Sequence, residues 1–218
     1  MNKPILIIGA GGHAAVLVDM LKQLDQEIIA LVSPEKTLGH AIFDGILHLQ
    51  NDDDVLQYSP QEVTLVNGIG SIPANSKNAP LRTKIYQHFK SRGYQFSSVI
   101  SPYAIISPYA TLAEDVQIMA NTVIQTGASI GENSIINTAA VIEHDCEIGS
   151  HNHIAPGAVL SGNVHTEEHV HVGTGASVIQ GINIEKNTVV GAGAVVSKNI
   201  PSDSIVYPAR SSVKGKSI

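Results

Sequence analysis

The hydrophobic pattern of the chain changes character near residue 98. From Ile100 to Val196 every sixth residue is Ile, Leu or Val, and Thr166 is the one exception among seventeen positions. Four residues after each of these comes a mostly small or β-branched residue, for example Cys146. A period of six fits neither an α-helix nor a β-hairpin, and it is typical of the hexapeptide parallel β-helix. The pattern predicts such a helix over residues 98–206.

Three hexads make one triangular coil of 18 residues, in which each side is a short strand with its aliphatic side chain pointing inward. The register predicts between five and six coils, each rising ~4.8 Å, which is the spacing of neighbouring strands. Cys146 falls on a small inward position, so we interpret it as structural. Thr166 interrupts the aliphatic series, which indicates either a local bulge or a tolerated substitution.

The first 97 residues instead alternate strand and helix patterns, which predicts a small open α/β unit with a parallel, Rossmann-like sheet. The predicted elements are a strand at 4–9, a helix with Val16, Leu17, Met20, Leu21 and Leu24 on one face, strands at Ile28–Val32 and Val63–Val66, and a helix across Ala79–Arg92. Ligands of such units bind at the carboxyl ends of the strands. Two glycine turns, at 9–13 and 68–70, lie at these ends.

A dinucleotide site is one interpretation of the first turn, because Gly9, Gly11 and Ala14 satisfy G-x-G-x-x-A. The acid that would bind a ribose after the second strand is absent, since Ser33 and Pro34 stand there. A unit of under 100 residues is also short for a dinucleotide. The sequence favours a mononucleotide or nucleotide-sugar site, and a purely structural turn stays open.

Charge and composition exclude several classes of protein. The net charge is −6, and no Lys or Arg lies between Gly93 and Glu185, which argues against a nucleic-acid partner. A single cysteine excludes a disulfide framework or a thiolate zinc site. No apolar run approaches 18 residues, and the first residues lack the sequence of n-region, h-region and cleavage site that a signal peptide has. We therefore expect a cytoplasmic protein without a membrane span.

The candidate catalytic residues gather around His144. Its inward neighbours in the hexad are Ile142 and Cys146, so His144 is expected at a strand end or corner, facing outward beside Glu143 and Asp145. A histidine beside carboxylates can be held in one tautomer, which suits a general base. The alternative is a solvated surface histidine.

Two further pairs of histidines are 18 residues apart and are expected to stack on successive coils: His153 with His171, and His151 with His169. Stacked imidazoles suggest a metal site. Because a third ligand is missing, we expect no metal, and we interpret His151 and His169 as surface or interface residues. The sequence assigns no role to His165 or His171.

Taken together, the motifs resemble a known family, the left-handed β-helix sugar acyltransferases with a small nucleotide-sugar-binding N-terminal domain (PglD/NeuD-like). That family includes N-acetyltransferases of bacillosamine-type and perosamine-type amino sugars and relatives that O-acetylate sialic acid. The resemblance covers nearly the whole chain and rests on the segments IIGAGGHA, GIGS, SPYAIISPYA, VIEHDCEIG, HNHIAPGAVLSGNV and PAR.

The resemblance implies a role for each matching residue. His144 would be the base that takes a proton from the acceptor amine, and Asp145 would orient it. Acetyl-CoA would be the co-substrate, with His153 near the thioester and the backbones of Thr174 and Ala192 near the pantetheine. The positions that match the nucleotide-sugar pocket are Gly11, Gly12, His13, Gly70 and, at the nucleobase, Ser33. The resemblance also implies a homotrimer with active sites between subunits.

The expected function is an acetyl-CoA-dependent N-acetyltransferase that acts on a UDP-4-amino-4,6-dideoxy sugar for surface glycans. The alternatives are O-acetylation of a sugar such as sialic acid and a noncatalytic trimeric nucleotide-binding scaffold. Ser33 and Pro34 replace the acidic pair that often reads the nucleobase in this family, so the base stays open. Basic residues near the C-terminus suit the phosphates of CoA: Lys186, Lys198, Arg210, Lys214 and Lys216. For Lys214 and Lys216, in the predicted tail at 207–218, a solvated tail is an equal alternative.

Overall fold

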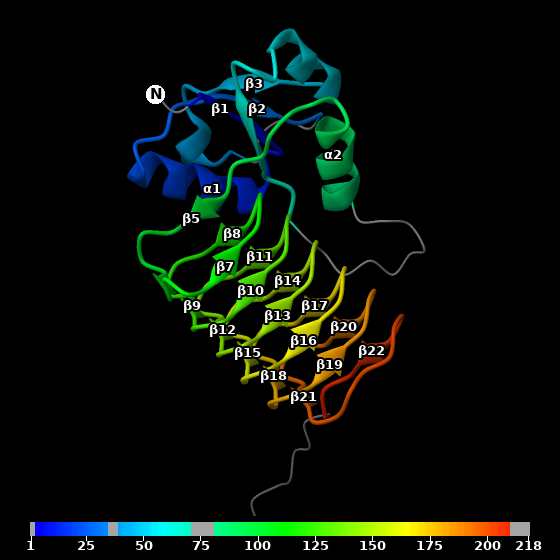
Figure 1. Ribbon diagram of the computed structural model, residues 1–218. Helices are drawn as coiled ribbons and strands as arrows, with labels where there is room; N and C mark the ends of the chain where they lie inside the picture. Colours follow the sequence, from blue (N-terminus) through cyan, green and yellow to red (C-terminus); the bar gives the residue numbers. More distant parts are fainter. Residues whose placement is uncertain (1–2, 35–38, 71–80, 210–218) are drawn as a thin grey trace, which may run out of the picture.

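The computed structural model describes residues 3–34, 39–70 and 81–209, which form an α/β unit followed by a parallel β-helix (Figure 1). Most of the predicted tail at 207–218 lies outside the described residues, as do Arg210, Lys214 and Lys216. No helix of the described ranges is long and apolar enough to cross a membrane.

The α/β unit is built on a four-stranded parallel sheet with strand order β3-β2-β1-β4. Its elements are β1 (Ile5–Ile8), α1 (Gly12–Gln23), β2 (Ile28–Val32), η1 (Ala41–Phe43), β3 (Leu47–Leu49), η2 (Asp52–Gln57), β4 (Thr64–Asn67) and α2 (Leu81–Lys90). The predicted strand at Ile28–Val32 is confirmed, and β4 lies one residue later than predicted. The edge strand β3 was not predicted, because three residues carry too little pattern.

Helices α1 and α2 cover opposite faces of this sheet. Ile5 and Ile7 of β1 pack with α1, whereas Leu6 and Ile8, which point to the other face, pack with α2. The prediction that Val16 is buried on α1 was wrong, because this side chain is 47% exposed. The buried stripe follows the helical spacing i, i+3, i+4, i+7 from residue 14, namely Ala14, Leu17, Val18 and Leu21, and position 16 falls outside it.

Each coil of the β-helix contributes one two-residue strand to each of three faces, which wind as a left-handed parallel β-helix. The seven-stranded face holds β5 (Val99–Ile100), β8 (Gln117–Ile118), β11 (Ile135–Ile136), β14 (His153–Ile154), β17 (His171–Val172), β20 (Val189–Val190) and β22 (Ile205–Val206). The six-stranded face holds β6 (Ile105–Ile106), β9 (Val123–Ile124), β12 (Val141–Ile142), β15 (Val159–Leu160), β18 (Ser177–Val178) and β21 (Val195–Val196). The five-stranded face holds β7 (Thr111–Leu112), β10 (Ser129–Ile130), β13 (Glu147–Ile148), β16 (His165–Thr166) and β19 (Asn183–Ile184).

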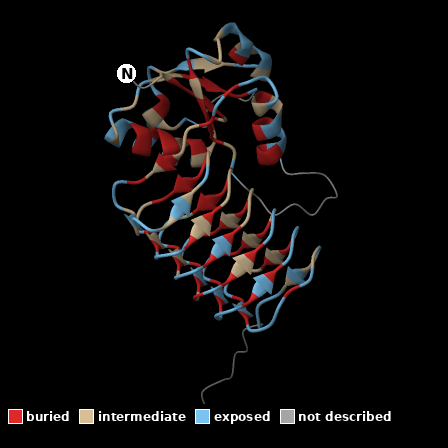
Figure 2. Ribbon diagram, viewed as in Figure 1, coloured by how far each residue is buried: buried red, intermediate tan, exposed pale blue. Residues whose placement is uncertain are grey.

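The second residue of most strands points into the prism and is buried, while the first faces outward or against the α/β unit (Figure 2). Cys146 is fully buried in this core, and its thiol donates to the carbonyl of Ser161 at 3.2 Å. The predicted inward register and the structural position of Cys146 are therefore confirmed. We name the three corners by the faces they join: seven–six, six–five and five–seven.

Thr166 stays in register between Ile148 and Ile184, so the predicted alternative of a bulge was wrong. Its hydroxyl lies in the core and accepts a hydrogen bond from Asn152 Nδ2 at 2.7 Å. Asn152, itself buried, also donates to the carbonyl of Glu167 and accepts from the backbone N–H of Val170. Because these polar atoms satisfy one another, the core tolerates a hydroxyl at an aliphatic position.

A mostly buried junction joins the α/β unit to the first coils. Val99, Met119 and Ile135 of the β-helix pack into the core on the α1 side of the sheet. On the α2 side, the buried Arg82 donates to the carbonyls of Asn67, Ile69 and Asn133 and lies 3.6 Å from Asp115. The junction therefore fixes the turn after β4 directly against the β-helix.

Candidate active site

His144 and Asp145 stand at the six–five corner, between β12 and β13, and both side chains are exposed, by 59% and 65%. His144 Nδ1 lies 2.9 Å from Asp145 Oδ2. Since a carboxylate only accepts, Nδ1 must carry the donated hydrogen, and this leaves Nε2 as a lone-pair acceptor in the neutral ring. Asp145 has a φ of 59°, in the left-handed region. The pair has the arrangement of an oriented base.

His153 lies on the seven-stranded face, where the side chain of Asn137 fixes its tautomer. Asn137 Oδ1 accepts from the backbone N–H of Thr138 at 2.8 Å, so its Nδ2 points at His153 Nε2, 3.1 Å away. Nε2 of His153 is thus an acceptor, and the neutral ring carries its hydrogen on Nδ1. His153 and His171 lie on successive coils, as predicted, with ring centroids 4.9 Å apart, but the rings meet edge-on at 79° and are not stacked.

Thr174 and Ala192 lie one coil apart at the seven–six corner, directly after β17 and β20. They therefore share a side of the prism with His153. The six-stranded face separates this group from His144, which stands at its other corner. Within one chain, the structure does not bring the predicted base together with the predicted thioester-binding residues.

The glycine turns meet at the carboxyl edge of the sheet, as predicted, but their glycines serve different purposes. A Cβ on Gly9 would lie 3.0 Å from the backbone of Gly68, and Gly9 has a φ of 112°, so this glycine is structural. Gly11 and Gly12 have no positive φ, and a Cβ on either would meet nothing within 4 Å. Neither strain nor packing requires glycine there, and the open space lies at the N-terminus of α1, where anions bind.

His13 is held by Gln117 from the β-helix, at 2.7 Å between Nε2 and Oε1. The amide of Gln117 can point only one way, because its Nε2 donates to the carbonyl of Asn67 at 2.8 Å. His13 therefore donates from Nε2 and keeps Nδ1 as an acceptor. Burial, together with the positive charge of Arg82, lowers the pKa of His13 to about 4, so the ring is neutral at pH 7.

The remaining predicted substrate residues lie at the same edge. Gly70 is close to His13, since a Cβ on Gly70 would lie 3.5 Å from that of His13. Ser33 follows β2 and is buried, with its N–H bonded to the carbonyl of Leu49 and its own carbonyl bonded to His48 Nε2 at 3.0 Å. The structure thus gathers Gly11, Gly12, His13, Ser33 and Gly70 along one edge of the sheet.

The second histidine pair lies at the five–seven corner. The rings of His151 and His169 are stacked, with centroids 4.9 Å apart, and Tyr86 of α2 contacts His151 edge-on. Asn133 Nδ2 lies 2.8 Å from His151 Nδ1, and burial lowers the pKa of His151 to about 4. His151 therefore belongs to the junction between the two units. In the described part of the chain, no group of three or more His, Cys, Asp or Glu side chains could hold a metal ion.

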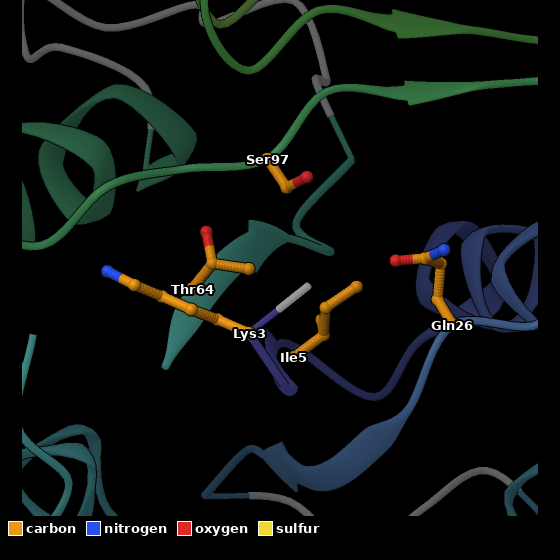
Figure 3. A pocket seen from close by; sticks show the side chains of 5 residues that line it. All are labelled: Lys3, Ile5, Gln26, Thr64 and Ser97. Atoms are coloured by element: carbon orange, nitrogen blue, oxygen red, sulfur yellow. The ribbon is translucent and has the colours of Figure 1, made fainter. Parts of the chain in front are cut away.

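A shallow hollow lies at the opposite, amino edge of the sheet, lined by Lys3, Ile5, Gln26, Thr64 and Ser97 (Figure 3). Lys3 Nζ is bonded there to the carbonyl of Pro60. This hollow lies at the amino ends of the strands, whereas the glycine turns lie at their carboxyl ends. Neither His13 nor His144 lines it. We do not assign it to the active site.

Sequence reasoning missed Gln117, Asn137 and Arg82, which orient the predicted residues. The signal for Asn137 is weak, because it lies 16 residues before its partner rather than 18. Gln117 lies 104 residues from His13, and no local pattern connects them. In the sequence, Arg82 looks like an ordinary surface cation on an amphipathic helix, but in the structure it is only 3% exposed.

Comparison with known proteins gives two family matches. Residues 4–89 match the PglD N-terminal domain, and residues 127–162 match the bacterial transferase hexapeptide repeats. No curated relative matches the chain.

Several solved structures are similar over nearly the whole chain. PerB from Caulobacter crescentus, in complex with CoA and GDP-perosamine, is 32% identical over 93% of this chain and 92% of its own, with a TM-score of 0.81. The acetyltransferase domain of PglB from Neisseria gonorrhoeae, in complex with acetyl coenzyme A, is 29% identical over 96% and 99%, with a TM-score of 0.82. WeeI from Acinetobacter baumannii is 26% identical over 94% and 97%, with a TM-score of 0.80. The chain belongs to the family of sugar N-acetyltransferases in which a PglD-type N-terminal domain precedes a left-handed hexapeptide-repeat β-helix.

Proposed function

We propose that the protein is an acetyl-CoA-dependent N-acetyltransferase whose acceptor is the amino group of a nucleotide-linked 4-amino-4,6-dideoxy sugar. The observation that carries the proposal is the exposed His144–Asp145 pair, joined at 2.9 Å at a corner of a β-helix that belongs to this family. CoA or acetyl-CoA is bound in PerB and in PglB, and GDP-perosamine is bound in PerB. We also propose that the protein acts in the cytoplasm, on a sugar that is used to build surface glycans.

In the proposed reaction, His144 accepts a proton from the attacking sugar amine. A 4-amino sugar is an ammonium ion at neutral pH, so it first releases one proton to solvent, and the resulting neutral amine has the lone pair that attacks. Nε2 of His144 accepts one proton while the amine nitrogen bonds to the thioester carbon, and Asp145 stabilises the resulting imidazolium through Nδ1. The carbon–sulfur bond then breaks, CoA leaves as a thiol, and His144 returns the proton to the sulfur.

The carboxyl edge of the sheet would hold the nucleotide sugar. The open backbone at Gly11 and Gly12 suits the diphosphate, which would approach the N–H groups at the start of α1. His13 would meet the substrate as a neutral acceptor through Nδ1 rather than as a cation, because Gln117 accepts from Nε2. Ser33 would lie nearest the nucleobase.

A homotrimer is part of this proposal, because one chain places its residues at two different corners. His144 is at the six–five corner, while Thr174 and Ala192 are at the seven–six corner. The outward positions of the six-stranded face between them form a row that is aliphatic except at Ser177 and that ends at Ile105 and Val195, 68% and 70% exposed. Burial of this row against other copies would bring the base of one chain to the pantetheine-binding residues of the next.

The function is tested by incubating the protein with acetyl-CoA and a UDP- or GDP-4-amino-4,6-dideoxy sugar, while thiol release and the mass of the sugar are followed. We expect one acetyl group on the sugar for each thiol released. No release with either nucleotide sugar, together with release when free sialic acid is supplied, would instead indicate O-acetylation. No release with any acceptor would favour a noncatalytic scaffold.

The shared site is tested by mixing two inactive variants. His144→Ala lacks the base, and Thr174→Trp places a large side chain at an exposed position among the residues predicted to bind acetyl-CoA at the other corner. Mixed trimers formed by co-expression should regain activity, because some sites combine an intact base from one copy with an intact acetyl-CoA site from another. Each variant refolded with itself is the control, and mixed trimers as inactive as these controls would contradict a site between copies.

A further inference from the structure

One hexad at the six–five corner breaks a rule that the rest of the β-helix follows. Two residues after each inward aliphatic position, at every sixth residue from 102 to 198, the chain carries a residue with a side chain except at Gly162. The other residues at these positions range from Ala and Pro to Glu, Lys and His144 itself. Gly162 is thus a single departure from the repeat, and it stands one coil after His144.

The backbone at Gly162 does not require glycine. Gly127 and Gly181, at the same corner, have φ values of 74° and 71°, whereas the φ of Gly162 lies outside the positive range. Any L-residue adopts such a conformation. The reason for glycine must therefore lie in what a side chain at this position would contact.

The imidazole of His144 occupies the space that a side chain would need. A Cβ built on Gly162 would lie 2.5 Å from both Cε1 and Nε2 of His144 and 3.1 Å from Cδ2. Carbon atoms attract one another near 3.5–4.0 Å and repel strongly at such short distances, so the ring would have to move. Gly127 stands one coil before Asp145, the hydrogen-bond partner of the ring, and a Cβ on Gly127 would clash with Asp145 Oδ1.

We propose that Gly162 is a positioning residue for the acetyl transfer: its missing side chain lets the His144 ring lie against the next coil, with Nδ1 on Asp145 and Nε2 open to the amine. The inference rests on the proposed function for its kinetic test and on geometry alone for its structural test. A methyl group at 162 would rotate the ring, break the 2.9 Å bond to Asp145 and displace Nε2.

The kinetic test compares Gly162→Ala with Gly181→Ala. We expect Gly162→Ala to lower kcat about 100-fold, as displacement of a catalytic group by about 1 Å does, with the KM for the sugar within about twofold and the Tm near that of the wild type. Gly181 is strained for alanine, but a Cβ there would meet nothing within 4 Å. Gly181→Ala should therefore lower the Tm and leave kcat unchanged. Equal kcat values in the two variants would overturn the proposal.

Two further measurements separate a role through His144 from a general one. In a His144→Ala background, which has no ring to displace, Gly162→Ala should cause no further loss of kcat and no loss of Tm. An additional loss in the double variant would show that Gly162 acts through something other than His144.

The NMR signal of His144 Cε1–H, identified by its disappearance in His144→Ala, should shift in Gly162→Ala and stay in place in Gly181→Ala, without any substrate. An unmoved signal in Gly162→Ala overturns the proposal. If the wild type instead transfers no acetyl group, the proposed function fails while this signal still reports on Gly162, so the two failures are distinguishable.

Discussion

The α/β unit and the β-helix place their candidate residues by different means. In the β-helix, each coil repeats the last, and the candidate base His144 lies one coil before Gly162, which lacks the side chain that the other residues at its position of the hexad carry. In the α/β unit nothing repeats, and His13 takes its orientation from Gln117, which lies in the other unit. In the β-helix, a departure from the repeat therefore points to the candidate base, whereas in the α/β unit the site depends on contacts between distant residues.

The largest expected effect comes from removal of the candidate base. His144→Ala should lower kcat by roughly 10²–10⁴-fold, the range for loss of a general base, and should leave the Tm unchanged because the side chain is exposed. His165→Ala is the matched control, since His165 is also on the β-helix and also pairs with a carboxylate, that of Glu147, at 3.2 Å. A similar loss of kcat in both variants would contradict a specific role for His144.

Arg82→Met removes the hydrogen bonds and the ion pair that Arg82 makes across the junction between the two units. Asp115, which is fully buried, would lose its counter-charge, and the carbonyls of Asn67 and Ile69 would lose a donor. The free energy of unfolding should fall by about 3–5 kcal/mol, measured by chemical denaturation. Lys90→Met at the half-exposed pair with Glu114 should cost only about 0–1 kcal/mol. Equal losses would show that the buried pair is not special.

Acid should weaken the junction through His13. Its pKa in the folded protein is about 4, below the ordinary 6.5, so the unfolded chain binds more protons between these values. Stability relative to His13→Gln, which keeps a donor for Gln117 but does not titrate, should therefore be constant above pH 6.5. Between pH 6.5 and pH 4 it should fall by roughly 2–3 kcal/mol. Parallel stability curves for the two proteins across this range would contradict the neutral, buried ring.

Thr166 provides the smallest effect and tests a structural exception to the repeat. Thr166→Val restores the aliphatic pattern but removes the acceptor of Asn152 Nδ2, so we expect a loss of about 1 kcal/mol in unfolding free energy. Thr111→Val, at an exposed outward position of the same face, should change little. A more stable Thr166→Val protein would show that the period alone determines this core.

The sequence predicted the β-helix well because its signal is repeated in every hexad, and Ile100 through Val196 support one register. It predicted β2 with the correct bounds, because a continuous apolar run marks this strand. It did not predict β3, which has only three residues and forms by pairing with β2. The sequence also pointed to His144 and Asp145, which are neighbours in the chain. The sequence did not predict Gln117 and Asn137, which orient His13 and His153, because these contacts form only after the coils stack.

The central claim is a division of labour, in which the α/β unit holds the nucleotide sugar and His144 of the β-helix performs the proton transfer. The most direct test measures, on the same His144→Ala protein, the Kd for the UDP- or GDP-4-amino-4,6-dideoxy sugar by calorimetry and the rate of acetyl transfer to it. The account predicts a Kd within about twofold of the wild type together with a loss of transfer of at least about 100-fold. A Kd that weakens in parallel with the lost rate would contradict it, because His144 would then be a binding residue.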